Sequence, residues 1–424
     1  MIGPKLPGAL RSFLTAGVFG VACIHYAWFA PFGSAQSGLF VYDQASLVFL
    51  IVFLSFLFLS EALTRETLSR PESAPLKITL GFLGSALLLS NNLGVLILAL
   101  PVFLYFAMTG TSSTFRGQRA RSGLISLTWT VLLLCLLCIG CGLFLTGGGT
   151  MNVGGNGFSN VAHQPLFMLG WSMIFALEVS LLFFYPFAFF QKDACEAGDW
   201  NAGAIFRIAP SIVFAGLLFK WCRVEPGLPG SEALQGLAIS LSAVLFLVLL
   251  MGRNLLLVVH ALALVPVTLL LWSMTDLKAA PAALAALLVF SAAVSRFIYL
   301  LKRVGVKPSD SVRGLHEALR AASFGLRLEF FVLGLSLMPL GTFLGFGFFV
   351  QLPFEASICG ASLTMAIVLL LGRILELDQA LEGPEVRLSQ AESAIGVITL
   401  AALIVLGIYP TPLYNYIHYL SHLP

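Results

Sequence analysis

Long apolar stretches, bounded by polar residues, glycine or proline, recur along almost the whole chain. A helix of about 20 residues, rising 1.5 Å per residue, crosses the ~30 Å hydrocarbon core of a bilayer. Hydrophobic residues make up 58% of the chain and charged residues 10%, whereas soluble proteins carry about 25% charged residues. The sequence therefore predicts an all-α integral membrane protein in which residues 1–424 form one polytopic domain.

The boundaries of these stretches predict about 13 transmembrane helices, within a range of roughly 12 to 14. The stretch 76–109 could form two short helices or one long one, because only Asn91 and Asn92 interrupt it. We expect broken helices near Pro210 and from Pro339 to Gly347, and such breaks recur where membrane proteins handle ions. The expected spans are 12–30, 44–63, 76–90, 93–109, 124–145, 166–187, 203–222, 233–251, 254–273, 280–301, 325–350, 356–375 and 391–410.

Loops rich in Lys and Arg alternate with loops that almost lack them, as the positive-inside rule requires. The pattern places the N-terminus in the cytoplasm and the C-terminus in the periplasm. It also predicts that 302–324 is a cytoplasmic amphipathic loop at the membrane surface. The basic residues assigned to the cytoplasmic loops are Lys5, Arg11, Arg65, Arg70, Lys77, Arg116, Arg119, Arg121, Lys192, Arg253, Lys302, Arg303, Lys307, Arg313, Arg320, Arg373 and Arg387. The opposite loops keep Lys220, Arg223 and Lys278.

Several function classes are excluded by what the sequence lacks. It contains no GxGxxG motif, no P-loop and no HExxH motif, so no nucleotide or metal cofactor has an evident site. Cys135, Cys138 and Cys141 share one helix face, but we expect them to pack as small apolar residues. A net charge of +3 is too small to indicate a nucleic-acid partner.

The segment 186–210, PFAFFQKDACEAGDWNAGAIFRIAP, carries the most specific pattern in the chain. It resembles the PFHFWLPDxYEGAPTPVTAFLSVAP stretch of the antiporter-like membrane subunits of respiratory complex I, the NADH-quinone oxidoreductase. The residues shared at the family spacing are Pro186, Phe187, Phe189, Asp193, Glu196, Ala209 and Pro210.

Three further stretches, 38–60, 85–108 and 336–349, resemble other motifs of the same family and occur in the same order. The resemblance covers about 38 to 376 and is greatest to subunit N. That family usually has 14 helices, and the loss of the first would give 13 helices and a cytoplasmic N-terminus.

The resemblance implies a membrane-arm subunit that couples quinone reduction to proton transfer beside other complex I membrane subunits in the lipid bilayer. NAD, FMN, iron–sulphur clusters and quinone would belong to the partner complex, and this chain would hold no cofactor and no catalytic redox site. A bacterial inner membrane is expected, because the chain shows no transit peptide.

The chain departs from the family at the residues expected to titrate. Leu98–Pro101 replaces the glutamate motif of the family, and uncharged residues replace its lysines. These replacements are Leu181, Ser211, Leu256 and Phe349.

The charged and titratable residues that remain inside apolar spans are the candidates for a proton path. A charge kept within a membrane is costly and invites a functional interpretation. Glu178 is the clearest candidate, although a neutral, hydrogen-bonded structural acid is an alternative. His260 can shuttle protons near neutral pH, or can be bound by a neighbouring carbonyl. Arg296 is the third candidate, and we expect its side chain to extend towards the membrane surface.

Lys192, Asp193 and Glu196 lie in a loop that could contact an adjacent subunit or simply be solvated. The absent family charges leave two alternatives to proton transfer open. One is a conduction-inactive structural scaffold of the same complex. The other is a stand-alone cation/proton antiporter, which should contain an internal repeat, and no convincing repeat is found.

Overall fold

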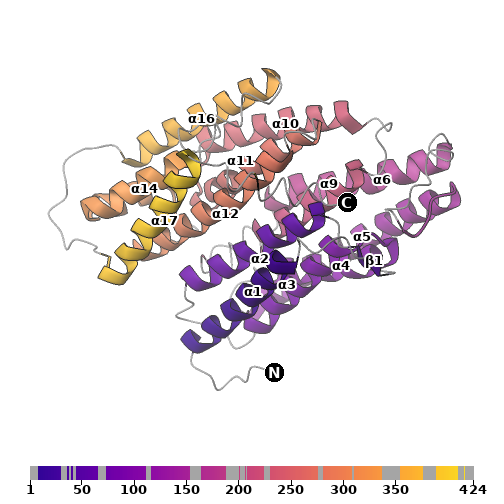
Figure 1. Ribbon diagram of the computed structural model, residues 1–424, viewed down its shortest axis with the longest axis horizontal. Coiled ribbons are helices and arrows are strands. Elements are labelled where there is room, and N and C mark those ends of the chain that lie inside the picture. The colour runs from indigo at the N-terminus through magenta and orange to yellow at the C-terminus, as the bar shows by residue number, and fades with distance from the viewer. Residues whose placement is uncertain are drawn as a thin grey trace.

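The structure, a computed structural model, consists of helices that lie side by side with their axes roughly aligned (Figure 1). It describes residues 8–29, 36–37, 40–41, 44–64, 73–110, 116–152, 164–187, 200, 206, 208–223, 230–275, 280–307, 310–336, 354–375, 388–408 and 415. The helices described are α1 Gly8–Phe29, α2 Gln44–Thr64, α3 Ser73–Leu89, α4 Leu93–Gly110, α5 Arg116–Thr146, α6 Pro165–Phe187, α9 Ala209–Arg223, α10 Gly230–Met251, α11 Leu255–Thr275, α12 Ala280–Arg303, α13 Val312–Arg320, α14 Phe324–Ser336, α16 Phe354–Leu375 and α17 Gln390–Ile408. Two short antiparallel strands, β1 Gln36–Ser37 and β2 Phe40–Val41, join α1 to α2.

Every predicted span overlaps one of these helices, and the additional helix, α13, lies in the segment 302–324. The ambiguous stretch 76–109 forms two helices, α3 and α4. The side-chain oxygen of Asn92 accepts a hydrogen bond from the Gly94 amide at 2.8 Å and so caps the start of α4. The backbone amide of Leu93 also bonds the Met151 carbonyl, at 2.9 Å, so the break is held from outside as well.

The interruption expected near Pro210 is the beginning of α9. Pro210 is the second residue of that helix, where a missing backbone amide costs little. Phe206 and Ile208, just before it, have π-helical geometry. The other expected break, from Pro339 to Gly347, lies outside the described residues.

The segment 302–324 is amphipathic as predicted. Ser311 caps α13 by accepting a hydrogen bond from Gly314, and the apolar face of the helix consists of Val312, Leu315 and Leu319, all buried. This helix packs against the end of α16, where His316 Nδ1 lies 3.0 Å from the Ile374 carbonyl oxygen. Its apolar face is therefore covered by protein, and its cytoplasmic location stays a prediction.

The centre of the bundle is α9, whose described side chains from Ala209 to Phe219 are all buried. A helix that is apolar on every side must be surrounded by other helices, and α9 contacts α2, α3, α6 and α11. Gly216 allows α2 to approach closely, because a Cβ there would meet the Phe49 ring at 3.1 Å.

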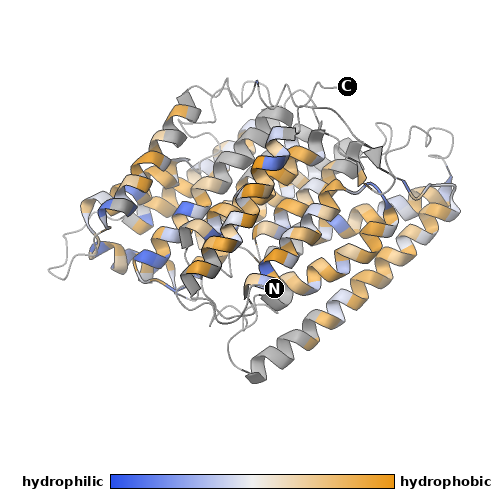
Figure 2. Ribbon diagram, turned by 60° about the horizontal axis from the view of Figure 1, so that its bottom comes forward, coloured by the Kyte–Doolittle hydropathy of each residue, from blue (hydrophilic) through white to orange (hydrophobic). Residues whose placement is uncertain are grey.

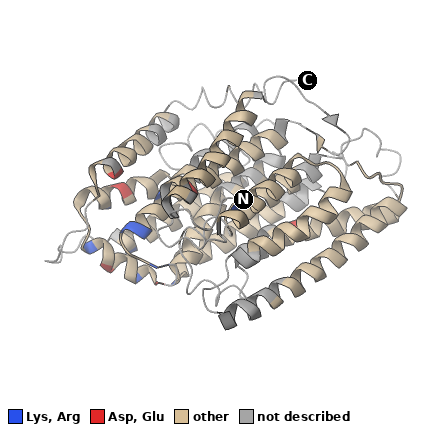
Figure 3. Ribbon diagram, turned by 90° about the horizontal axis from the view of Figure 1, so that it is seen from below, with Lys and Arg blue, Asp and Glu red and all other residues tan. Residues whose placement is uncertain are grey.

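The outer surface of the bundle is apolar. Large hydrophobic side chains are exposed on α1, α5, α10, α16 and α17, and Figure 2 shows hydrophobic colour on outer and inner helices alike. Uncharged residues cover most of the ribbon in Figure 3. An apolar surface of this extent is typical of proteins that contact lipid or other subunits.

Within the described residues, two helices are both long and apolar enough to cross a bilayer, at Leu127–Thr146 and Ala356–Ile374. The other apolar helical stretches found there are 10–17 residues long. The apolar exterior of the whole bundle therefore adds to these two helices as a sign of contact with lipid.

Candidate functional site

A buried ion pair joins the end of α2 to the beginning of α3. Lys77 Nζ donates a hydrogen bond to Glu61 Oε2 at 2.8 Å, and the side chains are 1% and 2% exposed. The expectation that Lys77 lies in a cytoplasmic loop is wrong. Lys77 can stay buried between α2 and α3 because Glu61 neutralises its ammonium group there. Its aliphatic stem packs with the apolar interior.

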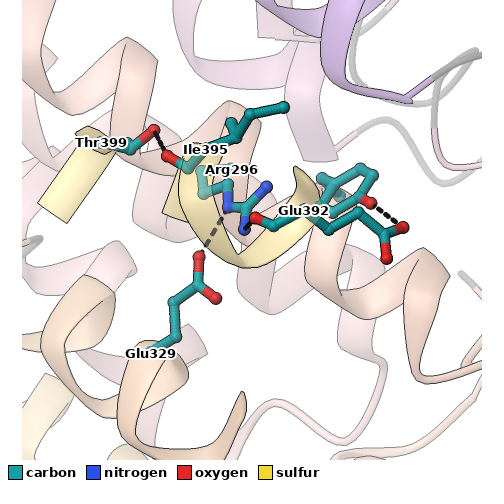
Figure 4. A network of polar contacts seen from close by, with 6 residues as sticks. Arg296, Glu329, Glu392, Ile395 and Thr399 are labelled. Carbon is teal, nitrogen blue, oxygen red and sulfur yellow. Dashed lines mark hydrogen bonds and ion pairs between the residues drawn. The ribbon is translucent and has the colours of Figure 1, made fainter. Parts of the chain in front are cut away.

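A second buried ion pair joins α12 to α14. Arg296 Nε donates to Glu329 Oε1 at 2.6 Å, and Arg296 is only 1% exposed (Figure 4). Its Nη2 group donates to the backbone carbonyl of Glu392 in α17, at 3.1 Å. The guanidinium also lies 4.7 Å from the centre of the Tyr299 ring. The expectation that Arg296 extends to the membrane surface is therefore wrong, because its partners lie inside the protein.

A pair of hydroxyl groups lies between the two ion pairs. Ser60 Oγ of α2 is 3.3 Å from Ser295 Oγ of α12, and both serines are fully buried. Ser60 precedes Glu61, and Ser295 precedes Arg296. Taken in order of contact, α3 and α2 share an ion pair, α2 and α12 share the hydroxyl pair, and α12 and α14 share the second ion pair. We refer to these six residues as the polar row: Lys77, Glu61, Ser60, Ser295, Arg296 and Glu329.

The chemistry of the polar row is acid–base chemistry. Each carboxylate lies within hydrogen-bond distance of a cationic partner in the interior of the protein. Serine hydroxyls both donate and accept hydrogen bonds, so they can pass a proton between neighbours. No group of three or more His, Cys, Asp or Glu residues within the described part of the chain is arranged to hold a metal ion.

Two sequence candidates, Glu178 and His260, are buried but lie elsewhere in the bundle. Glu178 of α6 is 0% exposed, and α6 packs mainly on α5 and α9. His260 of α11 is 1% exposed. Arg296 lies on α12, which packs on α2, α11 and α14. The structure therefore brings Arg296 into an ion pair without gathering all three candidates at one site.

The proposed partner-contact residues Lys192, Asp193 and Glu196 lie outside the described residues. Trp200, which follows them, is buried and donates a hydrogen bond from Nε1 to the Val306 carbonyl at 2.6 Å. This bond connects the end of that segment to the turn after α12.

The polar row occupies different helices from the charges of the resembled family. The positions at which the family carries lysine are occupied here by Leu181, Ser211 and Leu256, all buried, in α6, α9 and α11. The charges of the polar row lie in α2, α3, α12 and α14. The interior thus contains buried charge, but not at the positions that the sequence motifs indicated.

Sequence reasoning missed Glu61 and Glu329. Glu329 lies inside a predicted span and satisfies the same rule that selected Glu178. Glu61 is near the end of one apolar stretch, and its lysine is 16 residues later, near the beginning of the next. Opposite charges near both ends of a short interhelical connection are the signal that could have found this pair.

No protein-family model matches the chain, and no curated protein matches it. Solved structures do match in fold. A chain of respiratory complex I from Thermus thermophilus, solved with bound aureothin, is 19% identical with a TM-score of 0.76, covering 97% of this chain and 94% of that one.

Two other respiratory or membrane complexes contain similar chains. One is the archaeal membrane-bound sulfane sulfur reductase, with 12% identity, a TM-score of 0.76 and coverage of 97% of this chain and 95% of that one. The other is the Mrp complex from Dietzia sp. DQ12-45-1b, with 13% identity, a TM-score of 0.69 and coverage of 98% and 92%. The fold implied by the sequence motifs is therefore confirmed over almost the whole chain.

Proposed function

We propose that this chain is a proton-translocating subunit of the membrane arm of a respiratory NADH-quinone oxidoreductase. The observation that carries the proposal is the polar row, a set of buried acidic, basic and hydroxyl groups within a fold shared with chains of respiratory membrane complexes. Stability alone is a weak reason for a buried ion pair, because apolar residues of similar volume often stabilise a core equally well. The buried charges therefore favour a functional role.

The ion pairs supply the chemistry that translocation needs. Protonation of Glu61 or Glu329 removes the negative charge that holds its cationic partner, so each pair has two states that differ in hydrogen bonding. The hydroxyl contact between Ser60 and Ser295 connects the helices that carry the two pairs. Coupling between the two pairs through this contact is part of the proposal.

Glu178 and His260 are proposed to extend this path from α6 and α11. Both are buried titratable groups inside the bundle. The alternative is that Glu178 and His260 only stabilise the packing of the core and exchange no protons. Substitution by glutamine separates the two roles, because Glu178→Gln retains the shape of the side chain, and both Glu178→Gln and His260→Gln keep a polar group while removing proton exchange.

The same proposal covers assembly and location. Other complex I membrane subunits would be the partners, with Lys192, Asp193 and Glu196 contributing to a contact. NAD, FMN, iron–sulphur clusters and quinone would be held by those partners, and the complex would lie in a bacterial inner membrane. The N-terminus would be cytoplasmic and the C-terminus periplasmic.

A conduction-inactive scaffold is the second candidate function. Leu181, Ser211 and Leu256 favour it. They are uncharged and stand where the antiporter-like subunits that the sequence resembles have lysines. A stand-alone cation/proton antiporter is the third, and the matching chain of the Mrp complex keeps it open.

The first experiment is a mild-detergent purification of the tagged chain from its native membrane, with its partners identified by mass spectrometry. Recovery of NADH-oxidising and quinone-reducing subunits in equal amounts supports the proposed assembly. Recovery of the chain alone contradicts it and favours the stand-alone antiporter.

The second experiment measures protons pumped per electron by the purified complex in proteoliposomes. Glu61→Gln, Glu329→Gln and Glu178→Gln are compared with Glu317→Gln, a control in the exposed Arg313–Glu317 pair. A lower ratio in any interior variant with normal assembly supports translocation through this chain. Unchanged ratios in all three support the scaffold.

A further inference from the structure

On α17, the last described helix, most of the side chains that the structure describes are exposed or partly exposed. Large apolar side chains at Ile395, Val397, Ile398 and Val405 are exposed. At about 100° per residue these four positions share one side of α17, so the opposite side, which carries Glu392, Gly396 and Leu400, is turned to the bundle. Leu400 packs partly against the core. Polar contacts on this side add to the packing of Leu400 in holding α17 in place.

Three side chains of α12 converge on one residue in the first turn of α17. They are Arg296, Tyr299 and Arg303, spaced three and four residues apart, so they lie on one face of α12. Arg296 bonds the Glu392 carbonyl at 3.1 Å, and Arg303 Nε lies 3.3 Å from Glu392 Oε1. The Tyr299 hydroxyl donates to the same Oε1 atom.

The other carboxylate oxygen of Glu392 belongs to the start of its own helix. Ser389 and Glu392 form a capping box, in which Glu392 Oε2 accepts from the Ser389 amide at 2.7 Å and the Glu392 amide donates to Ser389 Oγ at 3.3 Å. The cap orients the carboxylate, and Oε1 is directed at α12. Glu392 therefore both begins α17 and fastens it to the bundle.

One turn later, Gly396 lies directly over the buried ion pair. A Cβ at this position would be 2.7 Å from Glu329 Oε1 and 2.8 Å from Arg296 Nη2. Only a glycine permits this approach, and the backbone of α17 thus covers Arg296 and Glu329. Figure 4 shows the Arg296 side chain beside α17, with Thr399 and Ile395 on one side of it and Glu392 on the other.

We propose that α17 is a lid over the Arg296–Glu329 ion pair and that Glu392 is its latch. Release of Glu392 from Tyr299 and Arg303 lets the start of α17 move outward, which admits water to the ion pair. Among the described side chains of α17, this movement exposes little further apolar area, because most of them are already exposed or partly exposed. The inference deepens the proposed function, on which it rests for its transport consequence, by naming the element that controls access to that site.

The test measures water access under the lid in the chain in its native membrane. Leu400→Cys places a thiol on the inner side of α17, and its reaction with N-ethylmaleimide is followed by mass spectrometry of the peptide that contains it. Maleimide reacts with thiols in water, so the labelling rate reports the open lid.

The decisive variant adds Tyr299→Phe and Arg303→Gln to Leu400→Cys, because this combination cuts the latch and leaves the Ser389–Glu392 capping box intact. Labelling of the introduced thiol should rise about tenfold, the change in population that a contact of about 1.4 kcal/mol maintains. Ser389→Ala is the matched control for helix fraying, since it removes the hydrogen bond from the Glu392 amide to Ser389 Oγ and keeps the latch. Arg313→Gln controls for loss of a surface arginine.

Two results overturn the lid. One is unchanged labelling in the Tyr299→Phe/Arg303→Gln variant, and the other is an equal rise in Ser389→Ala, which would assign the effect to fraying. The labelling does not depend on conduction. Faster labelling with an unchanged proton-to-electron ratio therefore supports the lid and counts against the proposed function, whereas unchanged labelling in a pumping complex overturns the lid alone.

Discussion

Ser60 of α2 and Ser295 of α12 meet through their hydroxyl groups, 3.3 Å apart and fully buried, although 235 residues separate them in the chain. Each serine directly precedes a member of a buried ion pair. The contact therefore marks the place where two helix pairs, each with its own internal charge, are packed against each other.

The hydroxyl contact predicts a selective transport defect. Ser60→Ala and Ser295→Ala each remove one hydroxyl, and the stability cost is expected to be about 1 kcal/mol, typical of one hydrogen bond. Pumping in proteoliposomes should fall even in complexes that are fully folded and assembled, because the loss of stability is small. The comparison is Ser362→Ala in α16, a half-buried serine bonded to its own helix. Equal pumping in all three variants would contradict a relay.

The Glu61–Lys77 ion pair predicts that a single substitution lowers the stability of the fold much more than the double substitution does. Glu61→Leu alone leaves the Lys77 ammonium buried without its carboxylate, which is expected to destabilise the fold by about 3–5 kcal/mol. The double variant Glu61→Leu/Lys77→Met should recover most of that loss. Thermal unfolding in detergent measures stability, and proton pumping by the double variant then shows whether the charges are needed once the fold is intact.

Gly396 predicts a steric effect in α17. In Gly396→Ala, the new methyl group would overlap the Arg296–Glu329 pair, with an expected cost of about 1–3 kcal/mol. Gly372→Ala in α16 is the control, because a Cβ there meets nothing within 4 Å. A lower unfolding temperature for Gly396→Ala only is the expected result, and equal temperatures would show that α17 does not lie against the pair.

The proposed contact by Lys192, Asp193 and Glu196 predicts a defect in assembly. Reversal of charge at Asp193 and Glu196 to lysine should weaken recovery of partner subunits during purification. The control is Glu317→Lys on the exposed face of α13. Equal recovery of partners in both variants would favour a solvated loop.

The positions of the helices could be predicted from the sequence because each depends on local information. A run of apolar residues long enough to cross a bilayer, with polar or glycine-rich ends, identifies a helix without knowledge of its neighbours. Ser311 and the spacing of Val312, Leu315 and Leu319 likewise indicate α13 locally. The break at Asn91 and Asn92 stayed open because it depends partly on a contact with Met151, which is distant in sequence.

The identity of each charge's partner was decided only by tertiary structure. The sequence predicts that Arg296 extends to the membrane surface and, from the alternation of loop charges, that Lys77 lies in a cytoplasmic loop. Hydropathy does not indicate that Glu329 and Glu61 lie within hydrogen-bond distance. The helix packing brings opposite charges together, and their mutual neutralisation makes burial possible where each residue alone would favour water.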